Sequence, residues 1–89
     1  METAKEDAIY SDDAFDAVTD AFLKQDYIEM LKAAKVLVSR HPDSSKSHFW
    51  LGRAFGGLNF NDDAIAELRQ AIKLKPDSAT AWFILLIFA

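Results

Sequence analysis

The sequence predicts an all-α fold of stacked, antiparallel helix pairs, and three observations lead to this prediction. Only three glycines and two prolines occur in 89 residues, which is few for an all-β chain and ordinary for helices. Apolar residues recur at the three- and four-residue spacing of helices. The chain also resembles itself when it is shifted by 34 residues, a period that marks helical repeats. A chain of this length forms one small domain at most.

The internal repeat divides the chain. The tripeptide Pro-Asp-Ser at 42–44 falls on the same tripeptide at 76–78, and Phe15, Phe49 and Phe83 align three deep. Proline cannot continue a helix, so it closes each unit. We therefore expect units of two helices, each about 34 residues long.

The predicted repeats cover 11–44 and 45–78, followed by a partial repeat at 79–89. The segment 1–10 precedes them and is expected to be disordered or to form a short helix. Loops of a few residues between the helices make neighbours antiparallel.

The first helix pair is expected at residues 12–24 and from Asp26 to about His41. Ser11 or Asp12 can cap the first helix, and acids occupy its first turn, where the helix dipole favours negative charge. Asp26 can cap the second helix, which Pro42 ends.

The second pair repeats this arrangement. The third helix is expected at 45–57, with Gly56 and Gly57 ending it. Asn61 is expected to cap a fourth helix that runs to about residue 75, and Ser78 a fifth that reaches Ala89. Five helices in sequence give two and a half repeats.

Residues 45–78 resemble a tetratricopeptide repeat, whose pattern is W-x2-L-G-x2-Y followed by A-x3-F, a further Ala and a Pro. The matching positions hold His48, Leu51, Gly52, Phe55, Ala64, Leu68, Ala71 and Pro76, so His48 replaces the tryptophan. Residues 11–44 and 79–89 match partly and in phase. The resemblance implies a right-handed superhelix with a concave groove lined by the first helix of each repeat.

Composition argues against several kinds of chemistry. The absence of cysteine excludes a disulfide framework, a thiolate zinc site and a cysteine nucleophile. His41 and His48 have no ligand-type residue at helical spacing, and both are interpreted as surface or repeat-edge histidines. The glycine pair at 56–57 lacks the other residues of a phosphate-binding loop. We expect no catalytic site, no metal and no cofactor.

The charge is uneven along the chain. The net charge of −4 argues against nucleic-acid binding, because a phosphate backbone would be repelled. Residues 1–20 carry seven acids and one lysine, whereas residues 21–89 are slightly basic. This acidic region either forms a solvated surface or attracts a basic partner electrostatically.

Binding of a protein or peptide in the groove is the function that the resemblance implies, in the role of a scaffold or adaptor. Trp50, flanked by Lys46 and Arg53, has the composition of a peptide anchor. The alternative that these rings are ordinary core stays open. The predicted groove residues are Phe15, Thr19, Phe22, Lys46, Phe49, Trp50, Arg53 and Phe83.

One specialised ligand is disfavoured. Some tetratricopeptide domains hold chaperone tails with a carboxylate clamp of lysines and asparagines. The matching positions here are occupied by Phe15, Thr19 and Trp50. A more hydrophobic ligand is therefore expected.

The C-terminal stretch 81–89 has no polar face. A helix that is apolar all round is buried on several sides, and nine residues span only about 13 Å, too short to cross a bilayer. Three explanations remain for what covers this helix. The chain can be part of a longer repeat array, or a regulatory part of a larger tetratricopeptide protein. It can form a homodimer through this helix, or the helix can dock on a membrane or on another protein. The residues expected to drive self-association are Trp82, Leu85, Leu86, Ile87 and Phe88. The N-terminus lacks the pattern of a secretory signal, which predicts a cytoplasmic location.

Overall fold

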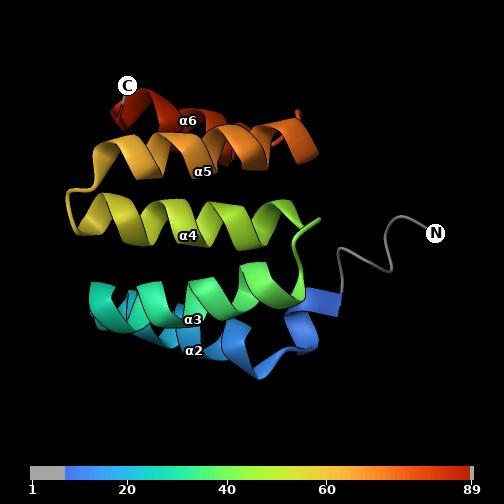
Figure 1. Cartoon of the computed structure of the whole chain (residues 1–89), viewed down its shortest axis with the longest axis vertical. Coiled ribbons are helices and arrows are strands. Elements are labelled where there is room, and N and C mark those ends of the chain that lie inside the picture. The colour runs from blue at the N-terminus through green and yellow to red at the C-terminus, as the bar shows by residue number, and fades with distance from the viewer. Residues whose placement is uncertain (1–7, 89) are drawn as a thin grey trace.

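The computed structural model describes residues 8–88 and is all-helical over that range (Figure 1). The predictions made for residues 1–7 and for Ala89 lie outside the described residues. The predicted all-α fold is confirmed, and the helices lie close to their expected positions. The elements are the 3-10 helix η1 (Ala8–Ser11) and the α-helices α2 (Asp13–Leu23), α3 (Tyr27–Arg40), α4 (Ser45–Gly57), α5 (Asn61–Leu74) and α6 (Ala79–Phe88).

The helices stack in chain order. Each of α2 to α5 packs against the helix that follows it, and α4 also contacts α6. Figure 1 shows the stack running from α2 to α6, with α2 behind α3 and α6 behind α5. Side chains of α2 also reach α4. The first helices of the successive pairs, α2, α4 and α6, therefore form one continuous row.

The repeat is visible in the backbone of the turns. Gln25 (φ 56°) and Asn59 (φ 67°) are the non-glycine residues with positive φ in the described chain, and they lie 34 positions apart. In each turn the next residue donates its N–H to the carbonyl oxygen five positions earlier, at 2.9 Å. This is the bond that closes a Schellman motif. The period of the sequence thus corresponds to a period in the chain path.

Three of the predicted helix caps are confirmed. Asp12 accepts a hydrogen bond from the backbone N–H two positions later at 2.9 Å. Asp26 and Ser78 accept from the N–H three positions later, at 3.2 and 3.4 Å. The predicted cap at Asn61 is wrong, because Asn61 is already the first residue of α5. Phe60 occupies the cap position, and no side chain caps this helix.

Small residues let α4 and α5 approach closely. A Cβ atom on Gly52 would lie 2.9 Å from Leu68 Cγ and 3.2 Å from the carbonyl oxygen of Ala64. Ala64 and Leu68 themselves are fully buried. The small residues of the repeat pattern are therefore explained by helix packing. The largest fully buried side chains are Ile9, Val18, Met30, Leu37 and Leu68.

His48 is a buried core residue, and its interpretation as a surface or edge histidine is wrong. It is 8% exposed. Its Nδ1 lies 2.8 Å from Glu67 Oε1 and its Nε2 lies 2.8 Å from the Pro42 carbonyl oxygen. Both ring nitrogens therefore have an oxygen partner within hydrogen-bond distance. His48 thus bridges α4, α5 and the preceding turn at the position where the repeat pattern has tryptophan.

Candidate protein-binding face

Four of the predicted groove residues meet where α2 and α4 pack together. The Trp50 ring makes edge contacts with Phe15, Phe22 and Phe49, at centroid distances of 6.5, 5.3 and 5.6 Å. Phe15 and Phe22 are two helical turns apart on α2 and therefore share one face. We call Phe15, Phe22, Phe49 and Trp50 the aromatic cluster. Every member is half-buried, so the cluster presents apolar surface to solvent.

The aromatic cluster is also continuous with the hydrophobic core. Phe15, Phe22 and Trp50 pack against the buried residues of the first three α-helices and η1. The Trp50 indole N–H is itself buried, with no hydrogen-bond acceptor among residues 8–88. Trp50 therefore serves packing whether or not a ligand touches its exposed edge.

Arg53 lies over this cluster. Its guanidinium carbon is 4.5 Å from the centroid of the Phe22 ring and 5.8 Å from that of Phe49. These distances are within the range of cation–π attraction. Burial lowers the pKa of Arg53, and the neighbouring Tyr27 partly offsets this effect. None of the ion pairs within residues 8–88 includes Arg53.

Two hollows open along α4. One, of about 280 Å³, is lined by Arg53, Gly56 and Gly57 of α4, by Tyr27 of α3 and by three apolar side chains of α6. The other, of about 60 Å³, lies toward the start of α4, beside Lys46 and Phe49. We call them the Arg53 hollow and the Lys46 hollow. Neither has an acidic side chain in its described lining.

Two predicted groove residues stand apart from the aromatic cluster. The Thr19 hydroxyl donates to carbonyl oxygens of its own helix, at 3.1 and 3.0 Å. Phe83 is 63% exposed on α6. No ring contact within residues 8–88 joins Phe83 to Phe49 or Phe15. The aligned phenylalanines of the three repeats are therefore not a continuous stack of rings.

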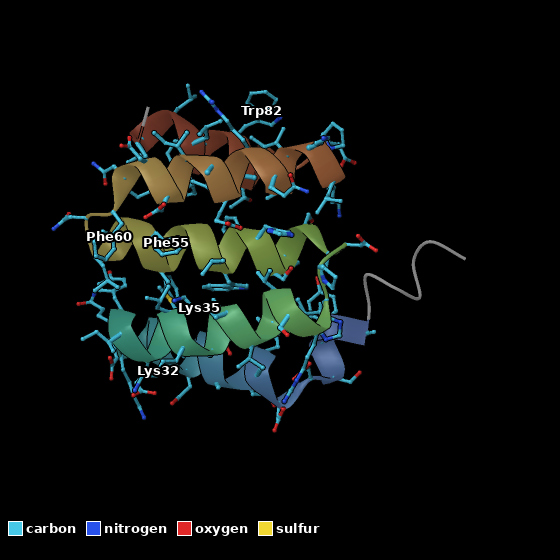
Figure 2. The ribbon with its side chains drawn as sticks, viewed as in Figure 1. Lys32, Lys35, Phe55, Phe60 and Trp82 are labelled. Atoms are coloured by element: carbon cyan, nitrogen blue, oxygen red, sulfur yellow. The ribbon has the colours of Figure 1, made fainter. Side chains whose placement is uncertain are left out.

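The residues predicted to drive self-association fall into two groups. Leu85 and Phe88 are half-buried, and the Phe88 ring lies against the backbone of α4, where a Cβ on Gly56 would collide with it. Trp82, Leu86 and Ile87 are 49%, 73% and 60% exposed. Trp82 lies on α6 at the end of the stack (Figure 2), and its Nε1 donates to the Pro76 carbonyl oxygen at 3.0 Å.

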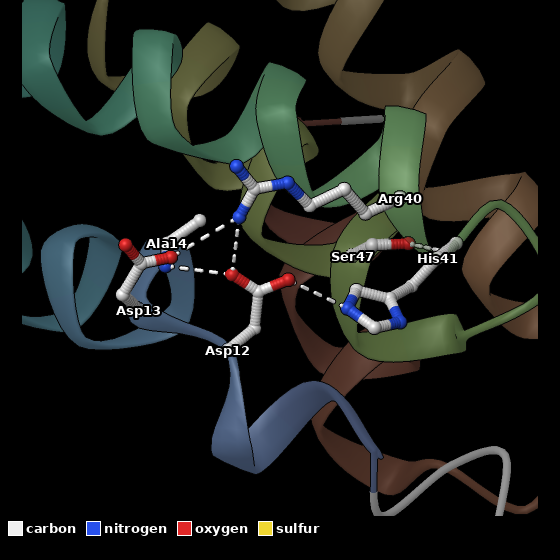
Figure 3. Close-up of polar contacts among 6 residues, drawn as sticks. All are labelled: Asp12, Asp13, Ala14, Arg40, His41 and Ser47. Atoms are coloured by element: carbon white, nitrogen blue, oxygen red, sulfur yellow. Dashed lines mark hydrogen bonds and ion pairs between the residues drawn. The ribbon is translucent and has the colours of Figure 1, made fainter.

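Sequence reasoning missed the network around Asp12, which joins the start of α2 to the end of α3 (Figure 3). Asp12 accepts from Arg40 Nη1 at 2.7 Å and from His41 Nε2 at 2.8 Å, besides its bond from the Ala14 N–H. The Ala14 N–H bond is the largest cause that lowers the Asp12 pKa to about 2. Burial opposes it, and His41 and Arg40 add to it. Antiparallel packing places the start of α2 beside the end of α3. The ion pair between Asp12 and Arg40 could therefore have been predicted from the expected topology.

A further hollow, of about 490 Å³, lies on the face formed by α2 and α3 and has the character of a solvated surface. Acids and bases alternate around a floor of alanines, and the pairs Lys24–Asp20 and Lys32–Glu29 lie at 3.0 and 3.3 Å. Within residues 8–88, no group of three acids or histidines is placed to hold a metal ion. Over the same range, no helix is long and apolar enough to cross a membrane.

Helix pairs that recur every 34 residues, each with the same positive-φ turn between its two helices, and that stack in chain order define the class as an α-helical repeat protein. No family model matches the sequence, and no solved structure matches the chain. The chain is 32% identical over 63 residues to tetratricopeptide repeat protein 37 of Xenopus laevis, a match that covers 71% of this chain. Together with the fold, this similarity shows that the chain is a tetratricopeptide-repeat-like protein. The match spans 4% of the length of that relative.

Proposed function

We propose that this chain is a scaffold or adaptor module that binds a peptide or partner protein on the row of α2, α4 and α6. The observation that carries the proposal is the half-buried aromatic cluster with Arg53 laid over it, beside an open hollow. Aromatic residues and arginine dominate the binding energy of protein interfaces. Similarity to a tetratricopeptide repeat protein supports the same function at the level of the family.

The experiment compares partners captured from a lysate by three forms of the protein. Phe49→Ser/Arg53→Gln alters the proposed face, and Arg69→Gln removes one exposed charge from α5, on the other row of helices. A partner held by the wild type and by Arg69→Gln, and lost by the double variant, is then purified and its Kd measured. Circular dichroism establishes that all three forms are equally helical. If every partner is held equally by the double variant, the binding face lies elsewhere.

A second candidate function is assembly of two copies through α6. The exposed apolar side chains of Trp82, Phe83, Leu86 and Ile87 favour it, because soluble monomers rarely expose a contiguous apolar patch of this kind. Sedimentation equilibrium of the wild type and of Leu86→Glu tests it, with Leu23→Glu as the control, since Leu23 is 80% exposed on α2. We expect a dimer for the wild type and the control and a monomer for Leu86→Glu. A wild type that is monomeric at all concentrations would remove this candidate.

A further inference from the structure

The outer face of α6 is apolar and uncovered. Trp82, Phe83, Leu86 and Ile87 are half to three-quarters exposed, and α6 contains no charged residue. These four side chains leave roughly 500 Å² of apolar surface accessible on each copy, because one aromatic side chain alone buries about 150–250 Å² when it is fully covered. Two such faces in contact would bury about 1,000 Å², which reaches the lower limit for a specific protein interface. The face is therefore large enough to hold a second copy of the chain.

Leu86 makes α6 unlike α4 at the point where the next helix packs. Gly52 of α4 lets Leu68 of α5 approach so closely that a Cβ atom on Gly52 would lie 2.9 Å from Leu68 Cγ. Leu86 stands 34 positions after Gly52, and its side chain fills the space that a helix like α5 would need. The close packing that joins α4 to α5 is therefore not repeated on α6. A helix that covers α6 packs at a greater distance, with apolar side chains from both helices between the backbones.

The opposite end of the stack is unsuited to cover α6. Ser47 and Trp50 are two of the residues through which α4 contacts the preceding helix pair. The residues 34 positions earlier, on α2, are Asp13 and Asp16, and both are exposed. Contact with α6 would take these carboxylates out of water, and α6 has no cation to pair with them. Copies of the chain are therefore not expected to add to one another head to tail.

We infer that the outer face of α6 is covered by the same face of a second copy, in a closed two-fold dimer that adds no further copies. In such a contact the same patch is used on both subunits, so each apolar face meets its like. Homodimer interfaces are also more apolar than those of transient complexes, which agrees with a face that carries no charge. This inference rests on the second candidate function and specifies which surface of the second copy covers α6. The two α2 helices lie at the far ends of the dimer, where their aspartates stay in water (Figure 1).

Sedimentation velocity and NMR of the full chain test this inference. With rising concentration we expect the monomer to give way to a dimer and to no larger species. In a mixture of isotope-labelled and unlabelled protein, NOEs between copies should join the Leu86 methyl groups to α6 of the other copy, and none should join α6 to Ala17, which is exposed on α2. Leu86→Glu should weaken the dimer roughly 30-fold or more, because it places an unpaired charge in the centre of the contact. Leu23→Glu, the same change at an exposed position of α2, should dimerise as the wild type does.

Each outcome decides one question. Species larger than a dimer, or NOEs between α6 of one copy and α2 of another, overturn the closed two-fold contact and leave self-association through α6 standing. A wild type that is monomeric at every concentration overturns this inference and the second candidate function together, and a different molecule must then cover α6. If Leu86→Glu is as helical as the wild type by circular dichroism and dimerises equally well, the interface lies elsewhere and the inference is wrong. The NOEs are measured on the wild type, so they decide the geometry even if a variant fails to fold.

Discussion

Replacing Asp12 by Ala should destabilise the fold more than any other single change of an acidic residue in α2 or at its cap. The side chain is 8% exposed and accepts hydrogen bonds from a backbone N–H, from Arg40 and from His41. These partners belong to the start of one helix and the end of the next. Removing the carboxylate therefore loosens the first helix pair as a unit.

The magnitude can be bounded in two ways, which share the hydrogen bond from the Ala14 N–H as their main contribution. Loss of an N-cap side chain costs about 0.5–2 kcal/mol. The Asp12 pKa falls from 3.8 to about 2 on folding, which at 1.36 kcal/mol per unit gives an upper bound of roughly 2 kcal/mol. Arg40 is half exposed, so solvent screening reduces its share. We expect a loss of about 1–2 kcal/mol, or a Tm lower by roughly 5–15 °C for a domain of this size.

The pH dependence has a definite sign. The folded-state pKa of Asp12 lies below its unfolded value, so folding favours the ionised carboxylate. The stabilisation is therefore fully present above the unfolded pKa of 3.8 and is lost as the pH falls through about 2. The free-energy difference between the wild type and Asp12→Ala should be largest at neutral pH and shrink toward pH 2.

The assay is urea denaturation followed by circular dichroism, at neutral pH and near pH 2. Asp13→Ala is the matched control, because its carboxylate also pairs with Arg40 at 3.1 Å but is 93% exposed. We expect that control to change stability by less than about 0.5 kcal/mol. Asp12→Asn, which can still cap the helix, should lose less than Asp12→Ala. Equal stability of Asp12→Ala and Asp13→Ala, or a difference that persists unchanged near pH 2, would refute the reasoning.

Three further predictions concern packing. Gly52→Ala should destabilise by about 1–3 kcal/mol in thermal denaturation, although alanine favours helices, because its Cβ would lie 2.9 Å from Leu68 Cγ; a stabilised variant would show that α4 and α5 can separate freely. Glu67→Ala should cost about 1–3 kcal/mol in urea denaturation, because it leaves a nitrogen of the buried His48 unpaired; no loss would mean that water replaces the carboxylate. Ile9→Ala should cost about 2–5 kcal/mol by the same measurement, because Ile9 is fully buried; a neutral result would place η1 outside the cooperative unit.

The helical architecture could be predicted because its signals are local and repeated. Caps at Asp12, Asp26 and Ser78 and the proline after each second helix lie within one turn of the element that they delimit. Gly52 was recognisable because the repeat pattern reserves that position for close approach. The predicted cap at Asn61 is wrong because the start of α5 is set by the backbone turn at Asn59, which has a positive φ. The presence of a polar side chain does not decide it.

The side-chain networks were harder to predict, because they depend on which helix ends meet. His48 was interpreted in isolation, and its partner Glu67 lies 19 positions away on a neighbouring helix. Trp50 was expected as an anchor, and its position within a group of rings could not be read from the spacing of one helix. The spacing of residues identifies the face of the helix on which a side chain lies. How deeply that side chain is buried depends on where the neighbouring helix packs, and the spacing does not give that.

The chain-order stack has a consequence for how the molecule opens. Since helices contact mainly their immediate neighbours, stability is distributed as in a one-dimensional array, and local unfolding begins at the ends. The final helix α6 rests largely on α5, whereas α4 has helices on both sides. Amide hydrogens of α4 should therefore exchange most slowly and those of α6 fastest. The helix that is expected to open most readily is also the most apolar. Each opening of α6 therefore exposes apolar surface that can associate with other apolar surfaces until the helix packs again.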